Sequence, residues 1–201
     1  MYLNELSEKV WMTKNARFCA AKRMCRNRIS STASVSLLSA SVIAINMLAF
    51  LNIGTREKTI ITIVTVILST FALVMSLLIS ILRYEYRENN YHQCGLDLEH
   101  LNQQLKIKIL ELSSQGMESS EEDNKKYLED YDAILRKYNL NHTDFDFQYS
   151  KFKAIDIREK SLLKNICYWI KWNFLDVSML YWLIAFIPII VIILAFCGIL
   201  S

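Results

Sequence analysis

The best candidates in the sequence for metal chemistry are the histidines and acids of residues 92–100. His92 and His100 lie eight positions apart in an expected helix, with Cys94, Asp97 and Glu99 between them. A helix rises ~1.5 Å per residue, so eight residues separate the two imidazoles by about 12 Å, too far to share one ion. We therefore expect neither a metal site nor a cofactor, and we interpret both histidines as surface or packing residues.

The chain lacks the sequence patterns of the common enzyme classes. It has no glycine-rich phosphate loop, no nucleophile elbow and no zinc-binding H-E-x-x-H. The acids Glu121, Glu122 and Asp123 stand at the start of an expected helix, where the helix dipole favours negative charge. We predict that the protein is not an enzyme. The alternative, a small enzyme in the central region, would rely on the histidines of the chain.

Three uncharged segments, residues 29–55, 59–82 and 177–201, are each long enough to cross a membrane as a helix. With 53% hydrophobic residues and a mean hydropathy of +0.20, the composition does not fit a soluble domain. Basic residues exceed acidic ones in residues 1–28 and 151–171. The positive-inside rule then places the N-terminus and the central region in the cytoplasm, and the C-terminus outside.

We predict an all-α membrane protein built from five regions. A basic, amphipathic cytoplasmic helix (1–28) either lies near the membrane or packs on the stalk described below. A transmembrane hairpin (29–82) follows, with spans at about 32–53 and 59–82 and a turn at 54–58. A cytoplasmic helical bundle (83–160), an interfacial aromatic helix (161–176) and a third transmembrane span (177–201) complete the chain.

The second transmembrane helix is expected to continue without a break to about residue 112, because no proline and only one glycine lie on the way. Its cytoplasmic part forms the stalk. Apolar residues recur there with the seven-residue spacing of a helix-pairing seam, which predicts a stalk assembly face and a homo-oligomer: Tyr84, Tyr91, Leu98, Leu101, Leu105 and Leu112. A further helix, with a capping-box start at Ser119 and an end near Asn139, should fold back antiparallel on this seam.

Polar side chains at seven-residue spacing also run through the second span and end at its cytoplasmic limit: Thr62, Ser69, Ser76 and Arg83. Such a row usually packs against other helices or bonds to its own backbone, and this is the interpretation we favour. The alternative is a water-filled path through the bilayer. In the first span, Asn46 is the best single candidate for an interhelical hydrogen bond.

The basic residues near the spans indicate a lipid partner, not a nucleic acid. The N-terminal basic arm can hold anionic lipid, but it lacks the interleaved aromatic residues that stack on bases. We therefore expect the lipid bilayer as a partner, and no direct binding of nucleic acid.

Several segments together resemble the SLATT family, the SMODS and SLOG-associating two-transmembrane effectors. The resemblance covers most of residues 10–160. It rests on the run AAKR at 20–23, LLISILRY at 77–84, YHQCGLDLEHL at 91–101, YDAIL at 131–135 and NHTDF at 141–145. The third span would be an addition to the two spans of the family.

The resemblance implies a membrane effector of a bacterial anti-phage defence system. Such an effector would oligomerise on a cytoplasmic signal and permeabilise or depolarise the inner membrane, so that infection is aborted. It would act beside a nucleotide-signal-producing enzyme or a reverse transcriptase, or respond to the product of one. The alternative function is a non-catalytic membrane anchor or scaffold that recruits a cytoplasmic partner through its helical stalk.

Overall fold

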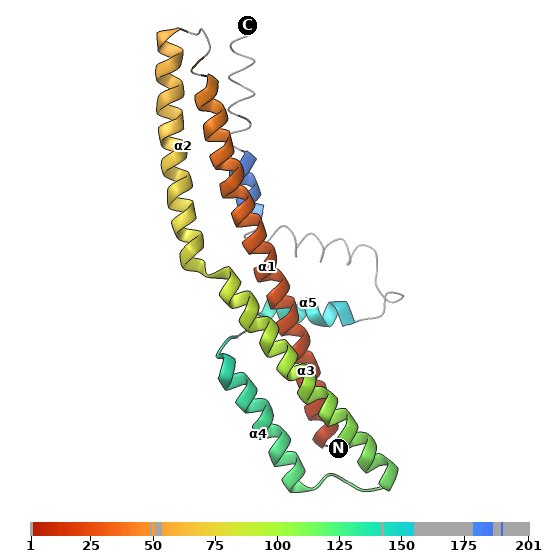
Figure 1. Ribbon diagram of the computed structural model, residues 1–201. Helices are drawn as coiled ribbons and strands as arrows, with labels where there is room; N and C mark the ends of the chain where they lie inside the picture. The colour runs from red at the N-terminus through yellow and green to blue at the C-terminus, as the bar shows by residue number, and fades with distance from the viewer. Residues whose placement is uncertain are drawn as a thin grey trace. The chain divides into compact units, whose positions relative to one another are not determined.

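In the part of the chain that the structure describes, a computed structural model, every regular element is a helix. The described residues are 2–48, 50, 54–141, 143–154, 179–186 and 190. The labelled helices are α1 (Tyr2–Leu48), α2 (Thr55–Leu82), α3 (Tyr84–Gln115), α4 (Glu121–Tyr138) and α5 (Asp144–Ala154), and residues 179–186 form one more helical segment (Figure 1). The expected interfacial helix (161–176) and most of the expected third span (177–201) lie outside the described residues.

The first quarter of the chain is one uninterrupted helix, α1. The sequence suggested a cytoplasmic helix that ends at residue 28 and a separate span after it, but the helix continues through that boundary to Leu48. The reason lies in composition, since no glycine or proline occurs before Gly54. Two compact units share α1: unit 1 takes its part up to Cys25, and unit 2 takes it from Arg26 onward.

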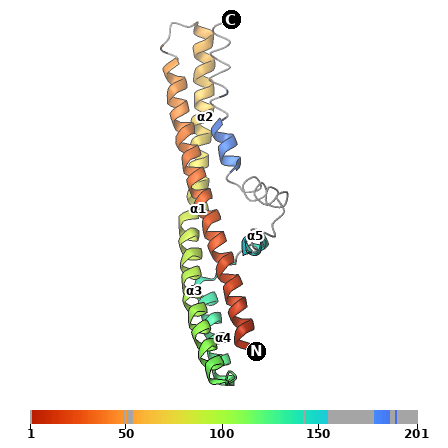
Figure 2. The ribbon, with the colours of Figure 1, turned by 90° about the vertical axis from the view of Figure 1, so that its right-hand side faces the viewer.

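Unit 1 contains the start of α1 together with most of α3, α4 and α5. Its apolar core joins α1, α3 and α4 and consists of Leu3, Leu6, Val10, Cys94, Leu98, Leu101, Leu105 and Tyr131. The helix α4 returns alongside α3, and α5 lies crosswise to α1 (Figures 1 and 2). Ion pairs link Lys108 with Asp123, and Lys137 with Asp97, so α4 is antiparallel to α3 as the sequence predicted.

Local capping chemistry ends α3 and bounds α4. After Gln115, Gly116 takes a φ of 62°, and the Met117 N–H donates to the Leu112 carbonyl at 3.0 Å, the bond that closes a Schellman motif. The next helix is capped by Ser120, whose Oγ accepts from the Asp123 N–H at 3.0 Å. This is one residue later than the predicted Ser119. The predicted end of α4 at Asn139 is confirmed, with a φ of 43° at that residue.

Unit 2 pairs the rest of α1 with α2, and the helical segment 179–186 packs with them. The two long helices run side by side in both views (Figures 1 and 2). Among the described residues, two helices are apolar and long enough to cross a membrane, one within Tyr2–Met47 and one within Lys58–Gln115. Only 11% of the most apolar window of the second is buried. A helix this apolar and this exposed is not the core helix of a soluble domain.

The predicted unbroken helix from the membrane into the stalk is wrong at one residue. Arg83 has φ 48° and ψ 45°, a left-handed conformation that ends α2 at Leu82, and α3 begins directly afterwards at Tyr84. Neither glycine nor proline marks this position, so sequence punctuation could not reveal the break. The turn expected at 54–58 is also shorter, because α2 already begins at Thr55.

Candidate functional site

Two hydroxyls of the polar row in α2 make hydrogen bonds to the backbone of their own helix. Thr62 Oγ1 donates to the Lys58 carbonyl at 2.9 Å, and Ser69 Oγ donates to the Val66 carbonyl at 3.0 Å. Both hydroxyls therefore satisfy their donors within their own helix, as expected of Ser and Thr in a membrane helix. Their remaining lone pairs face outward, because both side chains are exposed.

An open groove between α1 and α2 gathers part of the row. It has a volume of about 490 Å³, and its polar lining comes from Ser39 of α1 and from Ser69 and Ser76 of α2. The rest of the lining is apolar or small, as at Ala72. The structure thus brings two members of the predicted row together with a serine from the other helix. This groove, lined by Ser39, Ser69 and Ser76, is our candidate site in the membrane hairpin.

The other members of the row lie elsewhere. Thr62 and Arg83 do not line the groove, and both are exposed. Asn46 is exposed on α1 as well, and among the described residues its side chain makes no hydrogen bond to another helix. The interhelical bond that the sequence suggested for Asn46 is therefore not found in this part of the chain.

A second polar feature, which the sequence reading missed, is a buried stripe along α1. Buried residues recur at alternating intervals of three and four over nearly the whole helix, the spacing of a helix-pairing seam. They are Leu3, Leu6, Val10, Thr13, Arg17, Ala20, Met24, Asn27, Ser31, Ser34, Leu38, Ser41 and Ile45. Polar side chains at six of these positions hid the pattern from a search for apolar residues. The alternating three- and four-residue spacing of small and apolar residues is nevertheless visible in the sequence.

In unit 2 this stripe contacts the helical segment 179–186. Ser34 Oγ donates to the Tyr181 carbonyl, and the Tyr181 hydroxyl lies 3.0 Å from that of Tyr84. Tyr84 was predicted to begin the stalk assembly face. It is buried, but its hydroxyl pairs within unit 2.

The remaining stalk residues are covered inside the chain. Tyr91, Leu98, Leu101 and Leu105 are at most 3% exposed, and Leu112 packs partly buried against the same core. Their partners are α1 and α4, so the helix-pairing seam is occupied by helices of the same chain. Assembly through this face of α3 would require α1 or α4 to leave it.

The α1–α3–α4 core of unit 1 contains several polar contacts. Thr13 Oγ1 lies 3.0 Å from the Tyr131 hydroxyl, and Lys14 pairs with Glu99. The Lys14 hydrogen bond lowers the pKa of the Glu99 carboxyl below its ordinary value. These contacts join α1 to both of its neighbours and fix its register against them.

Arg17 is the exception in this core. Its side chain is buried, with the residue only 3% exposed, yet Nε and Nη1 have no hydrogen-bond partner among the described residues. The guanidinium lies 5.9 Å from the centre of the Tyr91 ring, a cation–π contact. A buried guanidinium that pairs with no carboxylate of the described residues is costly, so the packing of α1 on α3 has a weak point at Arg17.

A clamp between α1 and α5 joins two of the segments that carried the family resemblance. Arg23 Nε and Nη2 donate to Asp146 Oδ1 and Oδ2 at 2.9 and 2.8 Å. Thr143 caps the start of α5, because its Oγ1 accepts from the Asp146 backbone N–H at 3.3 Å, and its own backbone N–H and hydroxyl donate to Asp146 Oδ2. The Asp146 side chain is fully buried. The segments 20–23 and 141–145, far apart in sequence, are thus neighbours in space.

The titratable groups of the 92–100 segment do not form a metal site in the described part of the chain. His92 and His100 are both exposed, and nowhere among the described residues do three His, Cys, Asp or Glu gather as ligands. Burial raises the pKa of the Cys94 thiol. Hydrogen bonds, first that from Lys137, lower the pKa of Asp97, so these groups are engaged in packing and pairing.

Comparison with known proteins gives one match. A family model described as SMODS and SLOG-associating 2TM effector domain family 5, SLATT_5, matches residues 1–194. The match is wider than the segment 10–160 over which motifs carried the resemblance, and it contains both candidate membrane helices. No curated protein and no solved structure matches the chain.

Proposed function

Because the chain belongs to the SLATT_5 family of SMODS and SLOG-associating two-transmembrane effector domains, we propose that it permeabilises the bacterial inner membrane when a cytoplasmic signal arrives. The family is associated with SMODS and SLOG defence systems. In this proposal the protein is the effector of such a system against phage, and the depolarised cell dies or stops growing before the phage can multiply.

The observation that carries the proposal is the exposed apolar surface of α2. Ile67, Leu73 and Ile81 are 61%, 61% and 73% exposed, and they belong to the helix with the most apolar window of the chain. Exposure of this kind is stable in lipid, or against other membrane helices, but not in water. We place α1 from about residue 32, and α2, across the membrane, with unit 1 in the cytoplasm.

The groove lined by Ser39, Ser69 and Ser76 is where we place the polar path. One hairpin cannot enclose a water-filled opening, so the proposal requires a homo-oligomer in which several grooves face a common centre. Hydroxyls that are already bonded to their own backbone can line such a path at low cost, because their lone pairs still accept from water. Asn46 and Thr62 are exposed and can extend the lining.

Unit 1 is the proposed receiver of the signal. Its seam residues on α3 are covered by α1 and α4, so a resting chain offers no free seam to a second copy. A signal that loosens α1 at Arg17 would uncover the seam and permit assembly. The proposed source of the signal is a nucleotide-producing enzyme or a reverse transcriptase, acting directly or through its product.

The direct test is a membrane-potential measurement in bacteria that express the chain with its neighbouring defence genes. A potential-sensitive dye should report depolarisation within minutes of phage infection, and only in cells with the full system. Membrane insertion is checked by fractionation and by cysteine labelling from each side. Correctly inserted protein that never depolarises cells under any triggering condition would refute the proposal.

A second candidate function, a membrane scaffold, is favoured by one observation. In unit 1 the side chains of Ile107, Leu110 and Met117 are 58%, 69% and 57% exposed, unusual for a water-facing surface. A scaffold would use them to hold a cytoplasmic partner. Replacing Ile107 and Leu110 by Gln should then abolish defence, while Ser69→Leu with Ser76→Leu leaves it intact; the effector proposal expects the serine changes to abolish it.

A further inference from the structure

A pocket on unit 1 lies between α1, α3 and α5, apart from every residue used above for the membrane path. Its volume is about 450 Å³, within the range of small-molecule sites. It is lined by Trp11, Asn15, Phe18, Cys19, Ala21, Lys22, His92 and Ser150. We propose that this pocket binds a small molecule with a flat aromatic ring and an anionic group.

The aromatic walls of the pocket are held in place. The Phe18 ring meets the His92 ring edge to face, with centroids 5.7 Å apart and planes at 60°. Behind Phe18 lies Gly95, where an added Cβ would come within 2.7 Å of the Phe18 ring. Glycine at this point lets the ring sit against the α3 backbone. The pocket is therefore a prepared surface on which a flat ring can stack.

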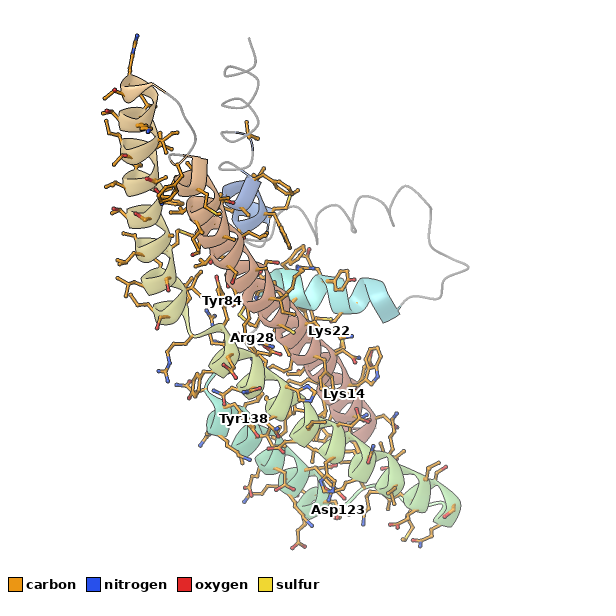
Figure 3. The ribbon with its side chains drawn as sticks, turned by 45° about the horizontal axis from the view of Figure 1, so that its top comes forward. Lys14, Lys22, Arg28, Tyr84, Asp123 and Tyr138 are labelled. Carbon is orange, nitrogen blue, oxygen red and sulfur yellow. The ribbon has the colours of Figure 1, made fainter. Side chains whose placement is uncertain are left out.

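The anionic group is inferred from Lys22. Every other basic side chain of α1 up to Cys25 contacts an acid or an aromatic ring: Lys9 and Arg17 lie over the rings of Tyr131 and Tyr91, Lys14 pairs with Glu99, and Arg23 pairs with Asp146. Lys22 has no such contact among the described residues, and it is exposed on α1 beside α5 (Figure 3).

One further polar group, the Asn15 amide, completes the recognition together with Lys22. Asn15 lies on the same wall of α1 and makes no hydrogen bond to other described residues, so its amide can donate to the ligand or accept from it. Lys22 supplies a point charge that suits either a carboxylate or a phosphate. Either ligand would therefore have an aromatic ring with an anion at its edge. The ring would contact Phe18 and His92, and the anion would contact the Lys22 ammonium.

Binding is tested with the full chain in nanodiscs of uncharged phosphatidylcholine. Saturation-transfer NMR measures indole-3-acetate against its neutral twin indole-3-acetamide, and adenosine 5′-monophosphate against adenosine, with empty nanodiscs as background. We expect at least one of the two anions to bind more tightly than its neutral twin. Lys22→Gln should lower the affinity for that anion about tenfold, because one charge-assisted hydrogen bond is lost.

Variants separate a specific site from general adhesion. His92→Leu removes a ring contact and should weaken the binding of both the anionic ligand and its neutral counterpart. Lys125→Gln changes an exposed lysine on α4 and should alter the binding of neither. The carboxylate and phosphate arms decide which anion the site prefers. The proposal is overturned if neither anion binds, if each neutral twin binds equally well, or if Lys22→Gln and Lys125→Gln behave alike. None of these results bears on membrane permeabilisation, which is measured separately.

Discussion

Arg23 and Asp146 face each other in parallel geometry, with two hydrogen bonds of 2.9 and 2.8 Å between α1 and α5. Two parallel bonds between a guanidinium and a carboxylate fix orientation as well as distance. Because Asp146 is fully buried and also accepts from Thr143, this pair determines where α5 attaches to α1.

Replacing Asp146 by Asn should destabilise unit 1 strongly. The change removes the carboxylate that accepts both hydrogen bonds of Arg23, whose side chain is only 15% exposed, and breaking a buried ion pair on one side costs about 3 kcal/mol or more. Thermal unfolding followed by circular dichroism in nanodiscs measures the effect. Asp144→Asn, an exposed acid two residues earlier on α5, is the matched control and should change the unfolding temperature little.

Replacing Arg17 by Met should stabilise unit 1, in contrast to Asp146→Asn. Methionine fills a similar volume without a buried charge, and exchange of buried ionic groups for apolar side chains ranges from neutral to stabilising by about 4 kcal/mol. The unfolding temperature should rise, and phage-triggered depolarisation should weaken because α1 is held more firmly. Arg136→Met, an exposed change on α4, should not raise it. A fall in the unfolding temperature of Arg17→Met would contradict the weakness inferred at this residue.

Asp97 should make stability depend on pH in the acid range. Lys137 Nζ and the Tyr138 hydroxyl donate to its carboxylate at 2.9 and 2.8 Å, and these bonds lower its pKa. The unfolded residue therefore binds its proton at a higher pH than the folded one. Its contribution is complete above the ordinary Asp pKa of about 3.9 and is lost as the pH falls through the lower folded pKa.

The measurement for Asp97 compares the wild type with Asp97→Asn. The difference in unfolding temperature should be constant from pH 7 down to about 5 and should shrink below about pH 4. If the difference in unfolding temperature between the wild type and Asp97→Asn grew as the pH fell, the lowered pKa of Asp97 would be contradicted. Asp132→Asn, an exposed acid on α4, serves as the control for a general charge effect.

Filling the groove should block the membrane path. Ser69→Leu with Ser76→Leu adds bulk where both serines line the groove, and the lost Ser69 hydrogen bond runs only to its own helix. We expect normal insertion but no depolarisation on infection. Ser80→Leu lies on the same helix, outside the groove lining, and should leave depolarisation unchanged. Equal behaviour of the two variants would remove the groove from the mechanism.

The sequence predicted the parts whose signals are local. The antiparallel return of α4 followed from its apolar face and the cap at Asn139, and two membrane-length helices followed from uncharged length. The left-handed Arg83 could not be predicted, because arginine has no preference for that conformation.

The sequence offered the covering of the α3 seam by α1 only as one of two alternatives, and it could not decide between them. The α1 stripe contains Arg17, Asn27 and several serines, which a search for apolar periodicity skips. Likewise, Ser39 lies on α1 and Ser69 lies on α2, and both line the groove. Nothing in their sequence spacing indicates that they are neighbours, so only the structure shows it. Local sequence patterns therefore predicted the helices. Which helices pack together depends mostly on contacts between segments that are far apart in the sequence.

The unbroken stripe of α1 constrains how the length of this helix can change. The two units take different stretches of one helix, from Leu3 and from Asn27 onward, along a single 3-4 pattern. Deleting or inserting one residue between Cys25 and Asn27 turns the second stretch by about 100° relative to the first, so the two stretches no longer follow one 3-4 pattern. Seven or eleven residues restore the phase to within about 20°. Length variants of α1 that keep the single pattern, whether natural or engineered, should therefore differ by seven or eleven residues.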